Sequence, residues 1–136
     1  MRRGELARAA GCHIETIRYY EQQGLLAAAG RTASGHRFYG PEELRRLRFI
    51  LRCRELGFAL REIRGLLALV DSGNWSCEEI RRQTERQLAG VRRRLADLQR
   101  MEARLASLVA ACDATHAPDC AILEMLFEEP QPGPRS

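Results

Sequence analysis

The sequence predicts a mainly α-helical protein with one short hairpin near its N-terminus and one long helix in its second half. Aromatic residues make up only 6% of the 136 residues and hydrophobic residues 45%, so aliphatic side chains must supply most of the core. Apolar residues recur at helical spacing over most of the chain. Both observations favour packed helices over a β-sandwich.

Two short helices are expected within residues 4–26, because apolar residues at helical spacing lie on both sides of Gly11. A tight hairpin, or wing, is expected over residues 31–39, where small and polar residues replace this pattern. Pro41 and the two Glu after it predict a helix start with an acidic first turn. That helix should end near Gly57.

A further helix is expected over residues 60–70, and we place a domain boundary after residue 74. Residues 75–112 are interpreted as one dimerisation helix, since no Pro interrupts them. Residues 113–127 are interpreted as a loop and a short helix, and residues 128–136, with three Pro, as a disordered tail.

The long helix has an apolar seam in which steps of four and three residues alternate. Such a seam predicts a partner helix, as in a coiled coil. The alternative is a helix that folds back onto its own domain. The seam positions are Thr84, Leu88, Val91, Leu95, Leu98, Glu102, Leu105, Val109 and Cys112.

Charge is unevenly distributed along the chain. The net charge is 22 − 18 = +4, but residues 1–76 carry 13 Arg and 8 acidic residues, which gives +5. The N-terminal half is therefore expected to bind a polyanion, although Arg-rich helix faces are often only solvated. The second helix of a helix-turn-helix enters the DNA major groove, and here it offers Glu15, Thr16, Arg18 and Tyr19.

Five motifs resemble, in order and spacing, the MerR family of transcriptional regulators. They are Gly4-Glu-Leu-Ala, Glu15-Thr-Ile-Arg-Tyr-Tyr-Glu, Gly24-Leu-Leu, Gly35-His-Arg-Phe-Tyr and Leu56-Gly-Phe-Ala-Leu-Arg-Glu-Ile. The resemblance implies a winged helix-turn-helix DNA-binding domain over residues 1–74, followed by a long antiparallel dimerisation helix. Arg3 departs from the family pattern, which usually has an apolar residue there.

The resemblance also implies DNA contacts, partners and a mechanism. A homodimer would bind double-stranded promoter DNA in the bacterial cytoplasm and distort it for RNA polymerase on the same promoter. We expect no membrane partner, because no apolar run reaches the length of a membrane span. The family's DNA contacts fall on Thr16, Arg18, Tyr19, Tyr20, Arg31, Arg37, Tyr39 and Arg54.

Three cysteines are placed for a site shared by two chains. Cys77 and Cys112 lie at opposite ends of the long helix, about 50 Å apart at about 1.5 Å per residue. Two antiparallel helices would bring Cys77 beside Cys112 of the partner subunit, and Cys120 could fold back to join them. Three thiolates suit soft divalent ions rather than Mg²⁺ or Ca²⁺.

The MerR resemblance supports this site, because metal-sensing members carry their ligands at these three places. A Cys at the start of the long helix resembles the pattern of the branch that senses Hg, Cd, Pb or Zn. His116 is interpreted as a loop residue, with a further nitrogen ligand as the alternative. Cys12 and Cys53 lie at helical core positions and are expected to be buried.

The sequence leaves other functions to compare with metal sensing. A regulator that responds to redox state or to a small molecule is the main alternative. An iron-sulfur switch needs a compact Cys cluster from one chain, which Cys112 and Cys120 alone do not make. A thiol enzyme would use a Cys with His116 as base, but no oxyanion-forming glycine motif or phosphate loop is present. We therefore expect no enzyme.

Overall fold

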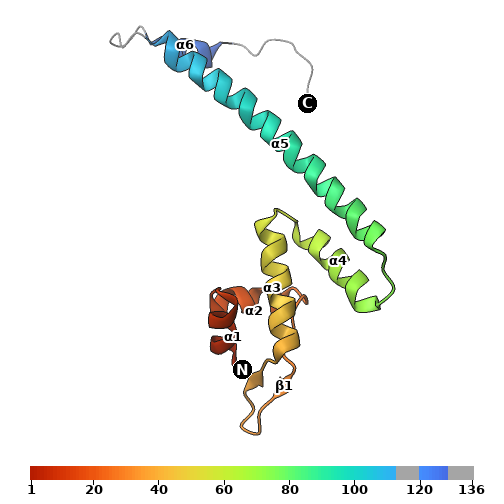
Figure 1. Ribbon diagram of the computed structural model, residues 1–136. Coiled ribbons are helices and arrows are strands. Elements are labelled where there is room, and N and C mark those ends of the chain that lie inside the picture. Colours follow the sequence, from red (N-terminus) through yellow and green to blue (C-terminus); the bar gives the residue numbers. More distant parts are fainter. Residues whose placement is uncertain (113–119, 129–136) are drawn as a thin grey trace. The chain divides into compact units, whose positions relative to one another are not determined.

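The computed structural model describes residues 1–112 and 120–128 (Figure 1). Six helices and one two-stranded antiparallel sheet are found there, which confirms the predicted mainly helical fold. The helices are α1 (Arg3–Ala10), α2 (Ile14–Gln22), α3 (Pro41–Glu55), α4 (Leu60–Ser72), α5 (Cys77–Ala111) and α6 (Ala121–Phe127), and the strands are β1 (Gly30–Arg31) and β2 (Arg37–Phe38).

The turn between α1 and α2 is where the sequence places it. Gly11 ends α1 with a φ of 76°, a left-handed conformation that side chains disfavour, and its N–H bonds the Ala7 carbonyl at 2.9 Å. Leu6 of α1 and Ile17 of α2 are fully buried in the same hydrophobic core. Their burial holds the two helices together and leaves the opposite side of α2 exposed.

The wing is a minimal hairpin in which Gly30 pairs with Phe38 and Arg31 with Arg37. At its tip, Gly35 has a φ of 86°, which glycine adopts without strain. The expected hairpin is thus confirmed.

Helices α3 and α4 begin as the sequence predicts. Pro41 is at the first position of α3, and the Glu43 carboxylate accepts a hydrogen bond from the Gly40 N–H at 3.0 Å.

One buried hydrophobic core joins α1, α2, α3, α4 and the segments between them. It is formed by Leu6, Ala7, Ile17, Tyr20, Leu25, Leu26, Tyr39, Leu47, Ile50, Cys53, Phe58, Ile63, Leu66 and Leu67.

The first compact unit extends past the expected boundary after residue 74, to Gln87. Ile80 packs against the core, so the start of α5 shares its apolar surface. Gln87 is buried, and its Nε2 donates a hydrogen bond to the Leu56 carbonyl at 2.9 Å. Packing therefore continues across the loop that suggested the boundary.

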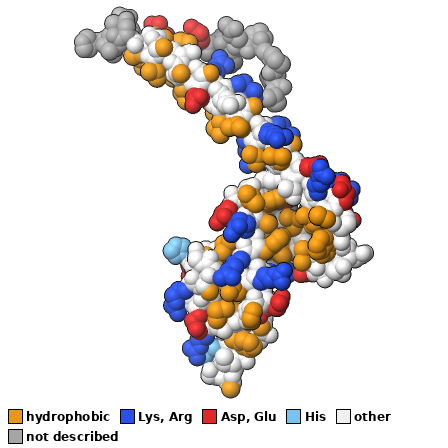
Figure 2. All heavy atoms as spheres, in the orientation of Figure 1, with side chains coloured by type: hydrophobic (Ala, Val, Ile, Leu, Met, Phe, Trp, Pro, Cys, Tyr) orange, Lys and Arg blue, Asp and Glu red, His pale blue; other side chains and the backbone are white. Residues whose placement is uncertain are grey.

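The second unit, residues 88–136, contains the remainder of α5 and the short α6. Its apolar seam is exposed to solvent, and hydrophobic side chains are visible along the helix in Figure 2. The exposed fractions are 45% for Leu88, 41% for Val91, 54% for Leu95, 58% for Leu98, 62% for Leu105 and 69% for Val109.

Some expectations fall outside the described residues. These are the loop over residues 113–119, which includes His116, and residues 129–136 of the expected tail. Among the helices that the structure describes, none combines the length and the apolar character that crossing a membrane requires.

Candidate nucleic-acid interface and cysteine positions

The exposed side of α2 carries polar side chains suited to DNA. Arg18 is about half exposed, and its Nη1 donates to Glu15 Oε1 at 2.6 Å. Tyr19 is 45% exposed, whereas Thr16 is only partly exposed. The Arg18–Glu15 pair is solvent-exposed and hence weak, so a phosphate can displace Glu15 at little cost.

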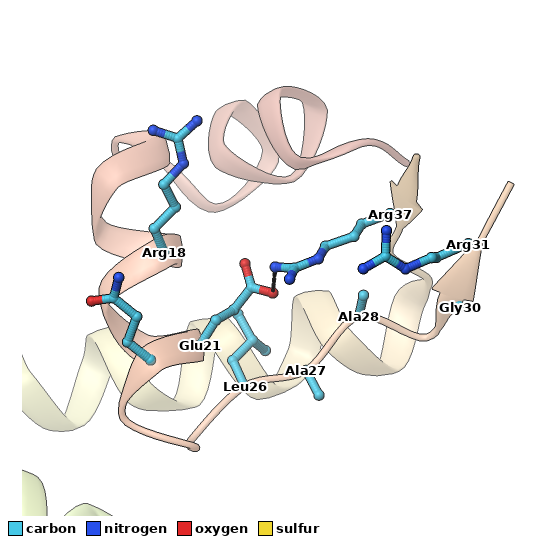
Figure 3. Close-up of a pocket in the computed structure, with 9 residues that line it drawn as sticks. Arg18, Glu21, Leu26, Ala27, Ala28, Gly30, Arg31 and Arg37 are labelled. Carbon is cyan, nitrogen blue, oxygen red and sulfur yellow. Dashed lines mark hydrogen bonds and ion pairs between the residues drawn. The ribbon is translucent and has the colours of Figure 1, made fainter. Parts of the chain in front are cut away.

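The wing places two further guanidinium groups near α2. Arg31 Nη1 donates to the Gly35 carbonyl at 3.1 Å, which holds the side chain along the hairpin. Arg18, Arg31 and Arg37 line one hollow between α2 and the wing (Figure 3). Three cations around one hollow create a positive potential that suits a phosphate group.

One carboxylate in this hollow was missed by sequence reasoning. Glu21 is on α2, three residues after Arg18, and its side chain is only 11% exposed. It accepts hydrogen bonds from Arg3, Arg37 and Tyr39, which lie outside α2. A signal was present in the sequence, because Arg3 stands where the MerR pattern usually has an apolar residue. A charged side chain at such a position needs a counter-ion.

Two predicted contacts, Tyr20 and Tyr39, are buried, at 6% and 0% exposed. Burial raises the pKa of Tyr20, and the nearby Arg54 partly offsets this. Tyr39 donates its hydroxyl hydrogen to Glu21 at 2.9 Å. Both rings therefore lie beneath the exposed surface, where they support it.

Arg54 is exposed near the end of α3, and its Nη1 donates to the Phe58 carbonyl at 3.0 Å. Arg46, on the same helix, joins three segments. Its Nε donates to the Leu25 carbonyl at 2.6 Å, and both terminal nitrogens reach the Asp71 carboxylate at 2.8 and 3.1 Å. The hydrogen bond from Arg46 lowers the pKa of Asp71.

The five cysteines fall into two groups. Cys53 is buried and Cys12 is partly buried against the same core, as expected, and burial raises the pKa of both thiols. Cys77 and Cys112 are exposed, and Cys120 is partly exposed. Within residues 1–112 and 120–128, no three His, Cys, Asp or Glu side chains gather to hold a metal ion.

The cysteines of the predicted site are separated by the length of α5. Cys77 is its first residue and Cys112 directly follows its last. An α-helix of 35 residues is about 50 Å long at about 1.5 Å per residue. Cys77 belongs to the first unit and Cys112 to the second.

Two family models match the chain. The model of the MerR helix-turn-helix regulatory proteins matches residues 1–70, and the MerR DNA-binding model matches residues 44–108. The chain belongs to the MerR family. The family consists of regulators, so the expectation that the chain is not an enzyme agrees with the comparisons.

Named MerR relatives include metal-resistance regulators. The mercuric resistance operon regulatory protein of Pseudomonas fluorescens is 44% identical over 111 residues, which is 82% of this chain and 76% of that protein. The crystal structure of the regulator PbrR691 from Ralstonia metallidurans CH34 in complex with lead(II) has a TM-score of 0.82 and 39% identity, and covers 93% of this chain and 98% of that one.

A third MerR relative has been solved on DNA. The structure of HiNmlR, a family member without the sensor domain, bound to promoter DNA has a TM-score of 0.60 and 25% identity. It covers 81% of this chain and 83% of that chain. These likenesses confirm the predicted MerR fold, a DNA-binding unit with a small wing followed by a long helix.

Proposed function

We propose that this chain is a homodimeric, metal-responsive regulator that binds promoter DNA and activates transcription. It would act in the bacterial cytoplasm, alongside RNA polymerase on the same promoter. Membership of the MerR family supports the regulatory role, and the mercury and lead regulators among its relatives support a heavy metal as the effector. A DNA-bound relative of the same fold supports the nucleic-acid partner.

The observation that carries this proposal is the placement of exposed cysteines at both ends of a helix with an exposed apolar seam. A second antiparallel copy would cover the seam and bring Cys77 next to Cys112 of the partner subunit. Both the dimer and a three-sulfur site with Cys120 then follow from one arrangement. The seam alone would support a coiled coil, but it would leave the cysteine positions unexplained.

The donor set suits Hg, Cd, Pb or Zn. Thiolate sulfur is a soft ligand that binds such ions more tightly than it binds Mg²⁺ or Ca²⁺. Exposure of Cys77 and Cys112 leaves both sulfurs accessible to a ligand. His116 remains a proposal as an added nitrogen ligand, since it lies outside the described residues.

The DNA-binding role rests on the exposed cations. We assign DNA contacts to Arg18 and Tyr19 on α2 and to Arg31 and Arg37 in the wing, all of which are exposed. Thr16 and Arg54 are proposed at the edges of the same surface. Tyr20 and Tyr39, being buried, are proposed to support the contact surface from beneath.

The effect of metal binding would be transmitted to the DNA-binding unit through the start of α5. Ile80 packs into the core of the DNA-binding unit, and Gln87 bonds the Leu56 carbonyl of that unit. A ligand set shared between Cys77 and the partner's Cys112 would therefore tie the partner's helix to this unit. Binding that favours one relative orientation of the two DNA-binding units can distort the promoter between them.

The test combines DNA selection with transcription. Purified protein would select duplexes from a random library, and the selected duplex would then serve as a template for bacterial RNA polymerase. We expect Hg, Cd, Pb or Zn to raise transcription severalfold, whereas Mg²⁺ alone has no such effect. Failure to select any duplex, or transcription that ignores all four ions, would contradict the proposal. A response to an oxidant or organic molecule instead would favour the alternative effectors.

A further inference from the structure

The Glu21 carboxylate joins three segments that are distant in the sequence. Its Oε1 accepts hydrogen bonds from Arg3 Nε at 3.1 Å and from the Tyr39 hydroxyl at 2.9 Å. Its Oε2 accepts one from Arg37 Nη1 at 2.8 Å. The side chain is 11% exposed, so these bonds are partly shielded from water. Hydrogen bonds to charged groups are about twice as strong as neutral ones.

The donors come from the elements that must be aligned to bind DNA. Arg3 begins α1, Arg37 is in β2, and Tyr39 directly follows β2. Glu21 itself lies on α2, the predicted recognition helix, so the carboxylate attaches the wing to that helix. The base of the wing is also held by two hydrogen bonds between Met1 and the Tyr39 backbone and by the burial of the Tyr39 ring. The Glu21 carboxylate adds the side-chain bonds that join the wing to α2.

Arg37 has donors left after this contact. A guanidinium group offers five N–H donors, and among the described residues Glu21 is the only hydrogen-bond partner of the Arg37 side chain. Figure 3 shows the Arg37 side chain extended toward Glu21, with Arg18 and Arg31 around the same hollow. Glu21 thus holds Arg37 in place while other N–H groups remain free to bind a phosphate.

The position of Glu21 is unfavourable for simple electrostatic attraction. A carboxylate beneath a phosphate-binding surface repels the nucleic acid, and its removal alone would strengthen binding to any sequence. The cluster of Glu21, Arg3 and Arg37 has a net charge of +1, because two guanidinium groups surround one carboxylate. Glu21 therefore makes sense as an organiser of geometry rather than as a source of affinity.

We propose that Glu21 is a positioning residue that fixes the wing against α2 and thereby sets how well the protein distinguishes its promoter from other DNA. This inference rests on the proposed DNA-binding function. Specific binding requires both elements to meet their contacts together, whereas non-specific binding depends mainly on charge. Loss of the bonds from Glu21 should therefore lower the affinity for the promoter and leave the affinity for unrelated DNA unchanged.

The test compares Glu21→Gln with Glu85→Gln. Both changes remove one negative charge, but Glu85 lies on α5, its side chain is 58% exposed, and it pairs with Arg81, which is not among the proposed DNA contacts. Affinities would be measured for the selected promoter duplex and for an unrelated duplex of equal length. Glu21→Gln should reduce the ratio of the two affinities by about tenfold, because it weakens bonds to charged groups. Non-specific affinity should stay equal or rise, and Glu85→Gln should leave the ratio nearly unchanged.

A double-mutant cycle separates positioning from general loss of structure. In an Arg37→Ala background, Glu21→Gln should change the ratio much less than it does in the wild type. Hydrogen exchange of amides in residues 30–39, measured without DNA, should accelerate in Glu21→Gln and not in Glu85→Gln. Arg3→Gln changes one of the three side chains that donate to Glu21, so it should shift the ratio in the same direction by less. It replaces Glu21→Gln in the test if that variant does not fold.

The inference is overturned if both affinities fall together, if the cycle shows no coupling, or if wing exchange is unchanged. The proposed function fails separately, when the wild-type protein shows no preference between the two duplexes. In that case, faster wing exchange in Glu21→Gln would still support the structural role of Glu21. An unchanged exchange rate would reject this role as well.

Discussion

Charges placed in the seam of α5 should abolish the dimer. The change is Leu95→Asp with Leu98→Asp, two residues that are 54% and 58% exposed in the single chain. We expect the partner helix to cover these exposed halves. Complete burial of a Leu side chain contributes about 1.5–3 kcal/mol, so covering half of one contributes about 1 kcal/mol.

The magnitude follows from symmetry. Each dimer contains both residues twice, so the double variant loses about 4 kcal/mol of apolar burial. At about 1.4 kcal/mol per tenfold, the dissociation constant of the dimer should rise at least about a thousandfold. The cost of burying four carboxylates adds to this figure, which makes it a lower limit.

Sedimentation equilibrium would measure the dimer, and a matched variant controls for charge. Ala89→Asp with Arg93→Gln also changes the net charge by −2, on the exposed side of α5 away from the seam. This control should stay dimeric, whereas Leu95→Asp with Leu98→Asp should sediment as a folded monomer. A monomeric wild type, or a dimer in the seam variant, would refute the coiled-coil argument.

Three further predictions test separate parts of the structure. Arg18→Ala should weaken promoter binding by about 1–3 kcal/mol, partly restored at low salt; unchanged affinity in a titration would exclude Arg18 from the interface. Alkylation of metal-free protein should modify exposed Cys77 before Cys53, because burial raises the pKa of the Cys53 thiol and blocks access, and equal rates in the native state would contradict this. The Arg46 hydrogen bond lowers the pKa of Asp71, so its stabilisation is present above the unfolded pKa of about 3.9 and is lost as pH falls through the folded value. Asp71→Asn should therefore lower the free energy of unfolding by less than about 1 kcal/mol at pH 7, since Asp71 is 53% exposed, and should not change it in strong acid. A loss of stability that does not depend on pH in denaturant titrations would argue against the Arg46–Asp71 pair.

Local signals in the sequence were sufficient for most of the fold. Gly11 and Pro41 mark a helix end and a helix start for steric reasons that act within a few residues. The alternating seam through Leu95 and Leu98 predicted a long helix, and its apolar side chains are exposed in the single chain. These features depend on spacing alone, and spacing can be counted in one dimension.

Contacts between distant segments were not predictable in the same way. Glu21 meets Arg3 and Arg37, which are 18 and 16 residues away, and no local pattern determines such a meeting. Similarly, Gln87 bonds Leu56 across 31 residues, so the first unit extends beyond the glycine-containing loop that suggested its end. Tyr39 carries a phenol that suits DNA, but its burial depends on how the wing packs.

The central claim is that the metal site takes Cys77 from one chain and Cys112 with Cys120 from the other. The most direct measurement is metal titration of a mixed dimer that combines Cys77→Ser and Cys112→Ser chains, purified through two different tags. Each parent homodimer lacks one sulfur at both of its sites. In the mixed dimer, one site lacks Cys77 and Cys112 together, while the other retains all three sulfurs. We predict one tight site per mixed dimer, half the wild-type stoichiometry, and only weak binding by either parent. A mixed dimer without a tight site would contradict a site shared between subunits.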